Sequence, residues 1–234
     1  MDLIKNNNLS FFLETINRSF NTNYIQGDDI RSIIIDLIKR ISLNENKLKE
    51  IAKRSYDHVN GFTKIVLFES EDKKVKIRLH LWGEKYQKST ISDLHDHRWS
   101  YISIPIIGEL RESRFVENLE KNSCNSLKKV KYNCFSRGES EWLNLEGYEI
   151  VSLIKDTTKL HETGNVYFCA AGEIHQLEPT TLPCASIVVT FEPIKDYARV
   201  YRDKIETEDF MKIYVPNLDL KKIKESLLYV VKNA

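Results

Sequence analysis

The chain has 234 residues, 41% of them hydrophobic, and a formal net charge of +1, so it can form one large globular domain with its own core. No block of lysine and arginine alternates with aromatic residues, which argues against nucleic acid as a partner. No apolar run is long enough to span a bilayer, and the first eight residues lack the regions of a signal peptide. We therefore expect no membrane association and a cytoplasmic location.

The four cysteines are widely spaced, and no two of them form a Cys-x-x-Cys pair. They are Cys124, Cys134, Cys169 and Cys184. A zinc knuckle and a thioredoxin-like motif are therefore excluded. In a reducing compartment we expect all four to be free thiols.

Residues 9–56 are predicted to be helical. Apolar residues recur at helical spacing between Phe11 and Phe20. Asp28 can cap a second helix, and Ser42 or Asn44 can cap a third. Apolar stripes of this kind usually pack on a neighbouring layer. Residues 1–56 are therefore expected to form a helical extension that packs on the rest of the fold.

From Gly61 onward the hydrophobic period becomes that of strands. Strands are predicted at 62–68, 74–82, 129–135, 148–155, 165–169 and 185–191, without intervening helices. This pattern predicts an antiparallel sandwich or barrel over residues 57–196. In the C-terminal segment, 197–234, residues 197–216 give no clear pattern. A closing helix follows, with Leu218, Ile223, Leu227 and Val230 facing inward.

Two histidines, His95 and His97, stand two residues apart, directly before an apolar run. On a strand, side chains at i and i+2 point to the same face, so these imidazoles can converge on one point, as metal ligands must. His175 is the best candidate for a third ligand. Three neutral imidazoles suit zinc, iron, copper or nickel, and a position left open makes such a site catalytic rather than structural.

The same alternation places Trp99 and Tyr101 on the face of His95 and His97. Both side chains are then expected to line a pocket beside the metal. Tyr101 can supply a phenol to the reaction, and Trp99 can contact the substrate. Plain core packing is the alternative for both.

These residues resemble the two motifs of the cupins. His95-x-His97, three residues, Tyr101, six residues and Gly108 resemble the first motif, with tyrosine in place of glutamate and without the leading glycine. Gly164, five residues, Ala170-Ala171-Gly172, two residues and His175 resemble the second, with its proline and asparagine replaced. The resemblance implies a mainly β protein, a cupin double-stranded β-helix or jelly-roll barrel, behind a helical N-terminal extension.

Within the cupins, the chain is similar to the cysteine dioxygenase, or thiol dioxygenase, family. The similarity lies in residues 81–84, His95-Asp96-His97 and residues 108–115. It implies ferrous iron held by three histidines, with helices ahead of the barrel.

Three departures from the family pattern concern the substrate. Lys64 stands where the family has an arginine that holds the substrate carboxylate, and it lacks the bidentate fork of arginine. No cysteine lies beside Tyr101 in the sequence, so the thioether found in some members is not expected. Of the family's Ser-His-Tyr set only Ser186 remains. These changes make cysteine itself a doubtful substrate.

Other charged and titratable residues compete for a role. Arg78 is a candidate for binding an anion, and His80 shares its strand face but is expected to be structural. Glu173, next to the metal-binding turn, can orient a ligand. His161 and His58 are given no role.

We therefore expect a metal-dependent cupin enzyme, a non-haem Fe(II) dioxygenase that acts on a small thiol- or amino-acid-like carboxylate. The expected metal ligands are His95, His97 and His175, and Lys64, Arg78 and Trp99 would contact the substrate. The expected partners are this small molecule and dioxygen, and a homodimer is left open. The alternatives are a non-oxidative isomerase, lyase or hydrolase using Zn, Mn or Ni, and a non-catalytic ligand-binding cupin. No His-x-Asp, His-Glu-x-x-His or Gly-x-Ser-x-Gly motif offers a competing site.

Overall fold

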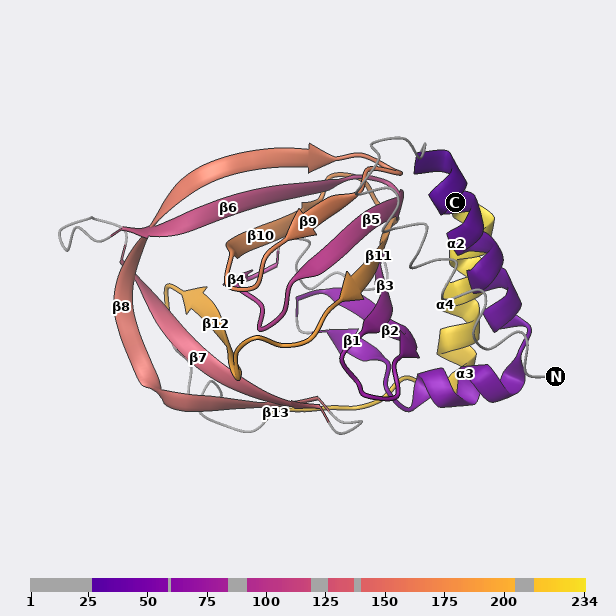
Figure 1. The fold of residues 1–234 in the computed structure, drawn as a ribbon, viewed down its shortest axis with the longest axis horizontal. Coiled ribbons are helices and arrows are strands. Elements are labelled where there is room, and N and C mark those ends of the chain that lie inside the picture. The colour runs from indigo at the N-terminus through magenta and orange to yellow at the C-terminus, as the bar shows by residue number, and fades with distance from the viewer. Residues whose placement is uncertain (1–26, 59, 84–91, 119–125, 137–139, 205–212) are drawn as a thin grey trace.

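The computed structural model describes residues 27–58, 60–83, 92–118, 126–136, 140–204 and 213–234. The helix predicted between Phe11 and Phe20 lies outside these residues. Within them, three helices lie together on one side of a large β structure (Figure 1). None of the helices in these ranges is long and apolar enough to cross a membrane.

The helices are α2 (Gly27–Ser42), α3 (Glu45–Ala52) and α4 (Leu220–Asn233). The predicted cap of α3 is confirmed, because the Asn44 side chain accepts a hydrogen bond from the Lys47 amide at 3.0 Å. Four residues expected to face inward near the C-terminus, Leu218, Ile223, Leu227 and Val230, are all buried. The apolar faces of the helices join one core cluster with strands of the first sheet. These helices therefore cover one face of the barrel.

The strands agree with the predicted ones where those were long, and the structure adds shorter ones. They are β1 (Tyr56–His58), β2 (Phe62–Glu69), β3 (Lys76–Trp82), β4 (Leu94–His95), β5 (Tyr101–Ile107), β6 (Leu110–Asn118), β7 (Ser126–Ser136), β8 (Ser140–His161), β9 (Tyr167–Cys169), β10 (Ile174–Pro179), β11 (Cys184–Thr190), β12 (Tyr197–Arg202) and β13 (Ile213–Val215). Strands β12 and β13 occupy part of the stretch for which the sequence gave no clear pattern.

The strands form two antiparallel sheets between which the chain crosses repeatedly. One sheet has the order β1-β2-β3-β11-β5-β9, and the other has the order β13-β8-β6-β10-β4-β12-β7. Strand β7 also pairs with β8, so six strands of the second sheet close into a ring. From β3 to β6, and again from β8 to β11, successive strands lie in opposite sheets. This is a jelly-roll topology, so the predicted mainly β fold, a cupin-type double-stranded β-helix, is confirmed.

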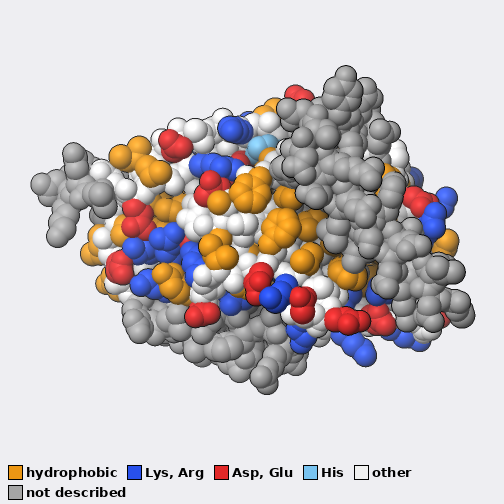
Figure 2. Space-filling view, in the orientation of Figure 1, with side chains coloured by type: hydrophobic (Ala, Val, Ile, Leu, Met, Phe, Trp, Pro, Cys, Tyr) orange, Lys and Arg blue, Asp and Glu red, His pale blue; other side chains and the backbone are white. Residues whose placement is uncertain are grey.

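The outer surface mixes apolar and charged side chains. Figure 2 shows hydrophobic side chains between basic and acidic ones on the face that Figure 1 presents. The exposed apolar residues include Val116 on β6 and Ile150 and Ile154 on β8. Scattered exposure of this kind is normal for proteins. The three-part division of the chain at residues 56 and 196 stays a prediction.

Candidate metal centre

The three predicted ligand histidines come together between the sheets. His95 ends β4, His175 lies in β10, and the two are directly paired across the antiparallel register. His97 follows in the connection to β5. The ring centroids are 4.7 Å apart for His95 and His97, 4.8 Å for His95 and His175, and 5.1 Å for His97 and His175. One nitrogen from each ring lies within 4.8 Å of the other two.

The protonation pattern of this cluster fits a metal ion. The His95 Nδ1 lies 2.7 Å from the carbonyl oxygen of Asp93, which can only accept, so Nδ1 carries the proton and Nε2 is left as a donor atom for a metal. The Nε2 of His175 is buried and makes no hydrogen bond.

The pKa values of His95 and His97 support the neutral, metal-binding form. Burial, followed by the neighbouring His175, lowers the pKa of His95 to about 3. Burial, followed by His95, also lowers the pKa of His97 well below 6.5. Imidazoles in this pocket therefore carry lone pairs at neutral pH.

One detail of the predicted geometry is wrong. The four residues His95, His97, Trp99 and Tyr101 do not lie on one regular strand, because the chain leaves β4 after His95 and crosses to the other sheet before β5. Their rings nevertheless lie close together. The His97 centroid lies 5.5 Å from that of Trp99 and 5.2 Å from that of Tyr101.

Asp96, between the first two histidines, faces away from them and anchors this crossing. Its buried carboxylate accepts hydrogen bonds from Lys195 and from the backbone amide and Nε of Arg199, the last two at 2.6 Å. Its own amide donates to the Arg199 carbonyl at 3.0 Å. The His-x-His segment is therefore fixed to β12 through its middle residue.

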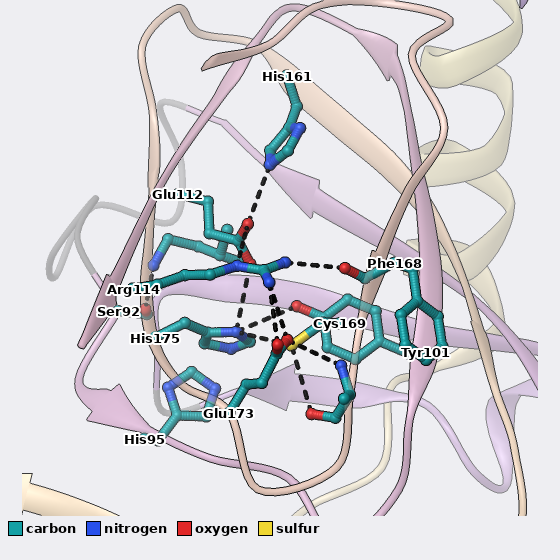
Figure 3. A network of polar contacts seen from close by, with 12 residues as sticks. Ser92, His95, Tyr101, Glu112, Arg114, His161, Phe168, Cys169, Glu173 and His175 are labelled. Carbon is teal, nitrogen blue, oxygen red and sulfur yellow. Dashed lines mark hydrogen bonds and ion pairs between the residues drawn. The ribbon is translucent and has the colours of Figure 1, made fainter. Parts of the chain in front are cut away.

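A carboxylate behind His175 fixes the third imidazole. Oε1 of Glu112 lies 3.5 Å from the His175 Nδ1, on the side opposite the free Nε2 (Figure 3). Oε2 of Glu112 accepts from His161 Nε2 and from Arg114 Nε, both at 3.1 Å. Burial raises the pKa of Glu112, but the bonds with His161 and His175 outweigh it, and the pKa lies well below its ordinary value. The charged carboxylate favours a proton on Nδ1 of His175, which leaves Nε2 for the metal.

Tyr101 and Cys169 contact the same nitrogen of His175. The Tyr101 hydroxyl lies 3.4 Å from the His175 Nδ1, and the Cys169 thiol lies 3.2 Å from it. The expectation that no cysteine lies beside Tyr101 is wrong, because β9 pairs with β5 and places Cys169 directly opposite Tyr101. Burial, followed by the neighbouring Cys169, raises the pKa of Tyr101 well above 10, so its phenol stays protonated.

A second group, Glu112, Cys169 and His175, also has ligand-type atoms within 4.8 Å of one another. We interpret it as support for His175 rather than as a separate site. Burial, followed by Glu112, raises the pKa of Cys169, so its sulfur is a neutral thiol and a poor ligand. Glu112 is already bonded to Arg114 and His161.

Glu173 does not orient a ligand histidine directly. Its carboxylate contacts Arg114 at 3.0 Å and accepts from the Ala170 amide at 2.9 Å. It therefore reaches His175 only through Arg114 and Glu112 (Figure 3).

His95 and His97 line a cavity of about 110 Å³ that also receives the predicted substrate residues Lys64, Arg78 and Trp99. Lys64 is 9% exposed, and its ammonium donates to the Tyr56 hydroxyl at 2.7 Å. Arg78 is 7% exposed, and its guanidinium carbon lies 4.9 Å from the centre of the Trp99 ring. The structure thus brings two buried cations to the pocket that His95 and His97 line.

Four residues with no sequence-assigned role contribute to this region. His58 and His80 line the cavity, and Glu112 and His161 support His175. The sequence contains one pattern that could have identified Glu112. Alternation from Leu110 places Glu112 on the same face as Leu110, so an inward acidic residue was readable there.

No protein-family model matches the chain, and no curated protein matches it. Solved structures give weak matches. A Lactobacillus farciminis oxalate decarboxylase in a formate complex has 13% identity and a TM-score of 0.36, over 62% of this chain and 32% of that one. A hydroquinone 1,2-dioxygenase bound to Cd²⁺ and 4-hydroxybenzonitrile has 15% identity and a TM-score of 0.34, over 63% and 72%. A DMSP lyase from Ruegeria pomeroyi has 11% identity and a TM-score of 0.33, over 65% of this chain and 55% of that one. The chain thus spans about a third of the decarboxylase. These scores are low, and the fold assignment rests on the strand order.

Proposed function

We propose that this chain is a metal-dependent cupin enzyme, a non-haem Fe(II) dioxygenase that acts on a small thiol- or amino-acid-like carboxylate. One observation carries the proposal. The ring nitrogens of His95, His97 and His175 lie within 4.8 Å of one another, and His95 and His97 line a pocket that also holds the cationic side chains of Lys64 and Arg78. In this proposal His95, His97 and His175 hold the iron, which when bound supplies the redox chemistry with dioxygen.

The protein side chains have separate tasks. Three neutral ligands leave the charge of the metal uncompensated, which favours an anionic group of the substrate near it. Lys64 and Arg78 attract and orient the carboxylate, and Trp99 holds the guanidinium of Arg78 by a cation–π contact. Tyr101, kept protonated, lines the cavity and can donate a hydrogen bond to a substrate there. The sheets around the pocket exclude bulk water.

A non-oxidative enzyme with Zn, Mn or Ni is the second candidate. The donor set itself favours it as much as iron, because three imidazoles with an open position also describe catalytic zinc sites. An isomerase, lyase or hydrolase would use the same pocket and the same cations. The cytoplasmic location and the homodimer stay predictions.

The test is elemental analysis of protein purified without chelator or nickel resin, with three single variants, His95→Ala, His97→Ala and His175→Ala. We expect about one metal ion per chain in the wild type and a large loss in each variant. His58→Ala is the matched control, because His58 lines the same cavity and is not one of the three ligands. Metal retained in all three variants would place the site elsewhere.

Oxygen-electrode measurements then separate the two candidates. The iron-loaded enzyme should consume dioxygen with a small thiol or amino-acid carboxylate. Stoichiometric zinc, manganese or nickel without oxygen consumption would favour the non-oxidative enzyme. A wild-type protein that binds no metal after anaerobic addition of Fe(II) would contradict both.

A further inference from the structure

Three polar side chains form a row across the pocket wall of the first sheet. In the antiparallel register, Lys64 of β2 pairs with His80 of β3, and His80 pairs with Ser186 of β11. Paired residues point to the same face of a sheet. All three line the cavity that receives the imidazoles. We call Lys64, His80 and Ser186 the polar row.

Two members of the polar row have unsatisfied polar atoms. The Nε2 of His80 and the Oγ of Ser186 are buried and have no hydrogen-bond partner. Ser186 is only 1% exposed. Buried polar atoms are normally paired, because leaving one unpaired is costly, so an unpaired pair on a cavity wall indicates a ligand.

The surroundings of the polar row differ on its two sides. On one side Phe62 and Trp82 pack with ring centroids 5.1 Å apart and close this end of the wall with apolar surface. On the other side the next row along the strands contains Arg78, Val188 and Ser103. The polar row therefore lies between the apolar rings of Phe62 and Trp82 and the row of Arg78.

The chemistry of the row fits a carboxylate. The ammonium of Lys64 supplies positive charge, and its position is fixed by the bond to the Tyr56 hydroxyl. Ser186 Oγ can donate one hydrogen bond, and a neutral imidazole can carry its proton on Nε2 and donate another. Hydrogen bonds to a charged acceptor are the strong ones.

We propose that Lys64, His80 and Ser186 form the carboxylate subsite of this pocket, with His80 and Ser186 donating hydrogen bonds to the substrate carboxylate. This inference rests on the proposed function for the identity of the substrate, and it assigns His80 and Ser186 as specificity-determining residues. It also separates Lys64, which contacts the carboxylate, from Arg78 in the next row.

The test uses metal-free full-length protein, with butyrate and its neutral isostere butyramide as probes. Calorimetric titration gives the affinities, and Trp82 and Trp99, which line the cavity, give a fluorescence signal. The wild type should bind butyrate more tightly than butyramide. Ser186→Ala and His80→Phe should each weaken butyrate binding about tenfold, the effect of losing one hydrogen bond to a charged group. Lys64→Met should abolish the preference for butyrate.

Ser103→Ala is the matched control. Ser103 is as buried as Ser186, also has an unpaired Oγ and lines the same cavity, but it lies in the neighbouring row. It should bind butyrate within about twofold of the wild type, far less than the tenfold loss expected for a hydrogen-bonded partner. Folded Ser186→Ala and His80→Phe proteins that bind butyrate like the wild type would overturn the inference, as would a larger loss in Ser103→Ala.

Metal titration of the same proteins separates this inference from the proposed function. Ser186→Ala and His80→Phe should keep stoichiometric metal, since neither touches the three histidines. A wild type that binds butyrate through the polar row but takes up no metal would contradict the proposed function and support the subsite. A wild type that binds metal, with a butyrate affinity that does not change in the polar-row variants, would support the proposed function and contradict the subsite.

Discussion

Replacing Glu112 with glutamine tests whether the carboxylate behind His175 sets the affinity of the metal site. The substitution keeps the size and shape of the side chain and removes its charge. In the native protein three nitrogen groups face this carboxylate: His161 and Arg114 are hydrogen-bonded to Oε2, and the Nδ1 of His175 lies 3.5 Å from Oε1. A carboxylate accepts from all three, whereas an amide has one acceptor oxygen and a second atom that only donates.

The size of the effect follows from which contact the amide loses. If its oxygen keeps the two 3.1 Å bonds from His161 and Arg114, its NH₂ group faces the Nδ1 of His175. That contact favours moving the imidazole proton to Nε2, the atom needed by the metal. Loss of such an outer partner typically lowers metal affinity 10- to 100-fold, or about 1.4–2.8 kcal/mol.

The assay is competition for Co²⁺ or Zn²⁺ against a chromophoric chelator, with circular dichroism to confirm folding. Glu173→Gln is the control, because Glu173 also bonds to Arg114 and lies two residues from His175, yet does not contact a ligand histidine. Its affinity should change less than about twofold, well short of the 10-fold minimum for a lost outer partner. Equal affinities for Glu112→Gln and the wild type would refute the role assigned to Glu112.

Two further predictions concern stability. Burial, followed by the charge of Lys64, holds the pKa values of His58 and His80 well below 6.5. As the pH falls, these two histidines are therefore protonated in the unfolded chain before they are protonated in the folded one. The stability that these sites contribute is complete above pH 6.5 and falls below it, by about 1.4 kcal/mol per pH unit for one histidine. His80→Phe should reduce this slope in urea unfolding measured at several pH values, and an unchanged slope would contradict the prediction. Separately, Asp96→Asn removes the buried charge that pairs with Lys195 and Arg199 and should cost about 3 kcal/mol. Asp93→Asn, which breaks an exposed pair with Arg202, should cost less than about 1 kcal/mol. Equal losses in the two variants would show that Asp96 is not an anchor.

The sequence predicts the local features of this fold well. Helix ends are set by short-range bonds, and the cap at Asn44 was readable because its partner, Lys47, is three residues away. The long strands were readable from alternating hydrophobicity. The two-residue strand β4 was not, because two residues carry no period.

The convergence of His95, His97 and His175 was predictable from type and spacing, but their supporting residues were not. The His95–Asp93 contact is local, because the two partners are two positions apart in the sequence. Cys169 meets Tyr101 only because β9 pairs with β5, and the sequence does not state that pairing. The expected absence of a cysteine beside Tyr101 failed for this reason, since adjacency along the chain was taken for adjacency in space.

The support for His175 depends on the register between β6 and β10. In this register His175 pairs with Arg114, so Glu112, two residues earlier on β6, is its diagonal neighbour on the same face. A slip by one residue would move Glu112 to the opposite face and remove the carboxylate from His175. His95 would keep its local carbonyl partner. The affinity for metal is therefore expected to depend on correct barrel assembly mainly through His175, while the tautomer of His95 is already set within its own segment.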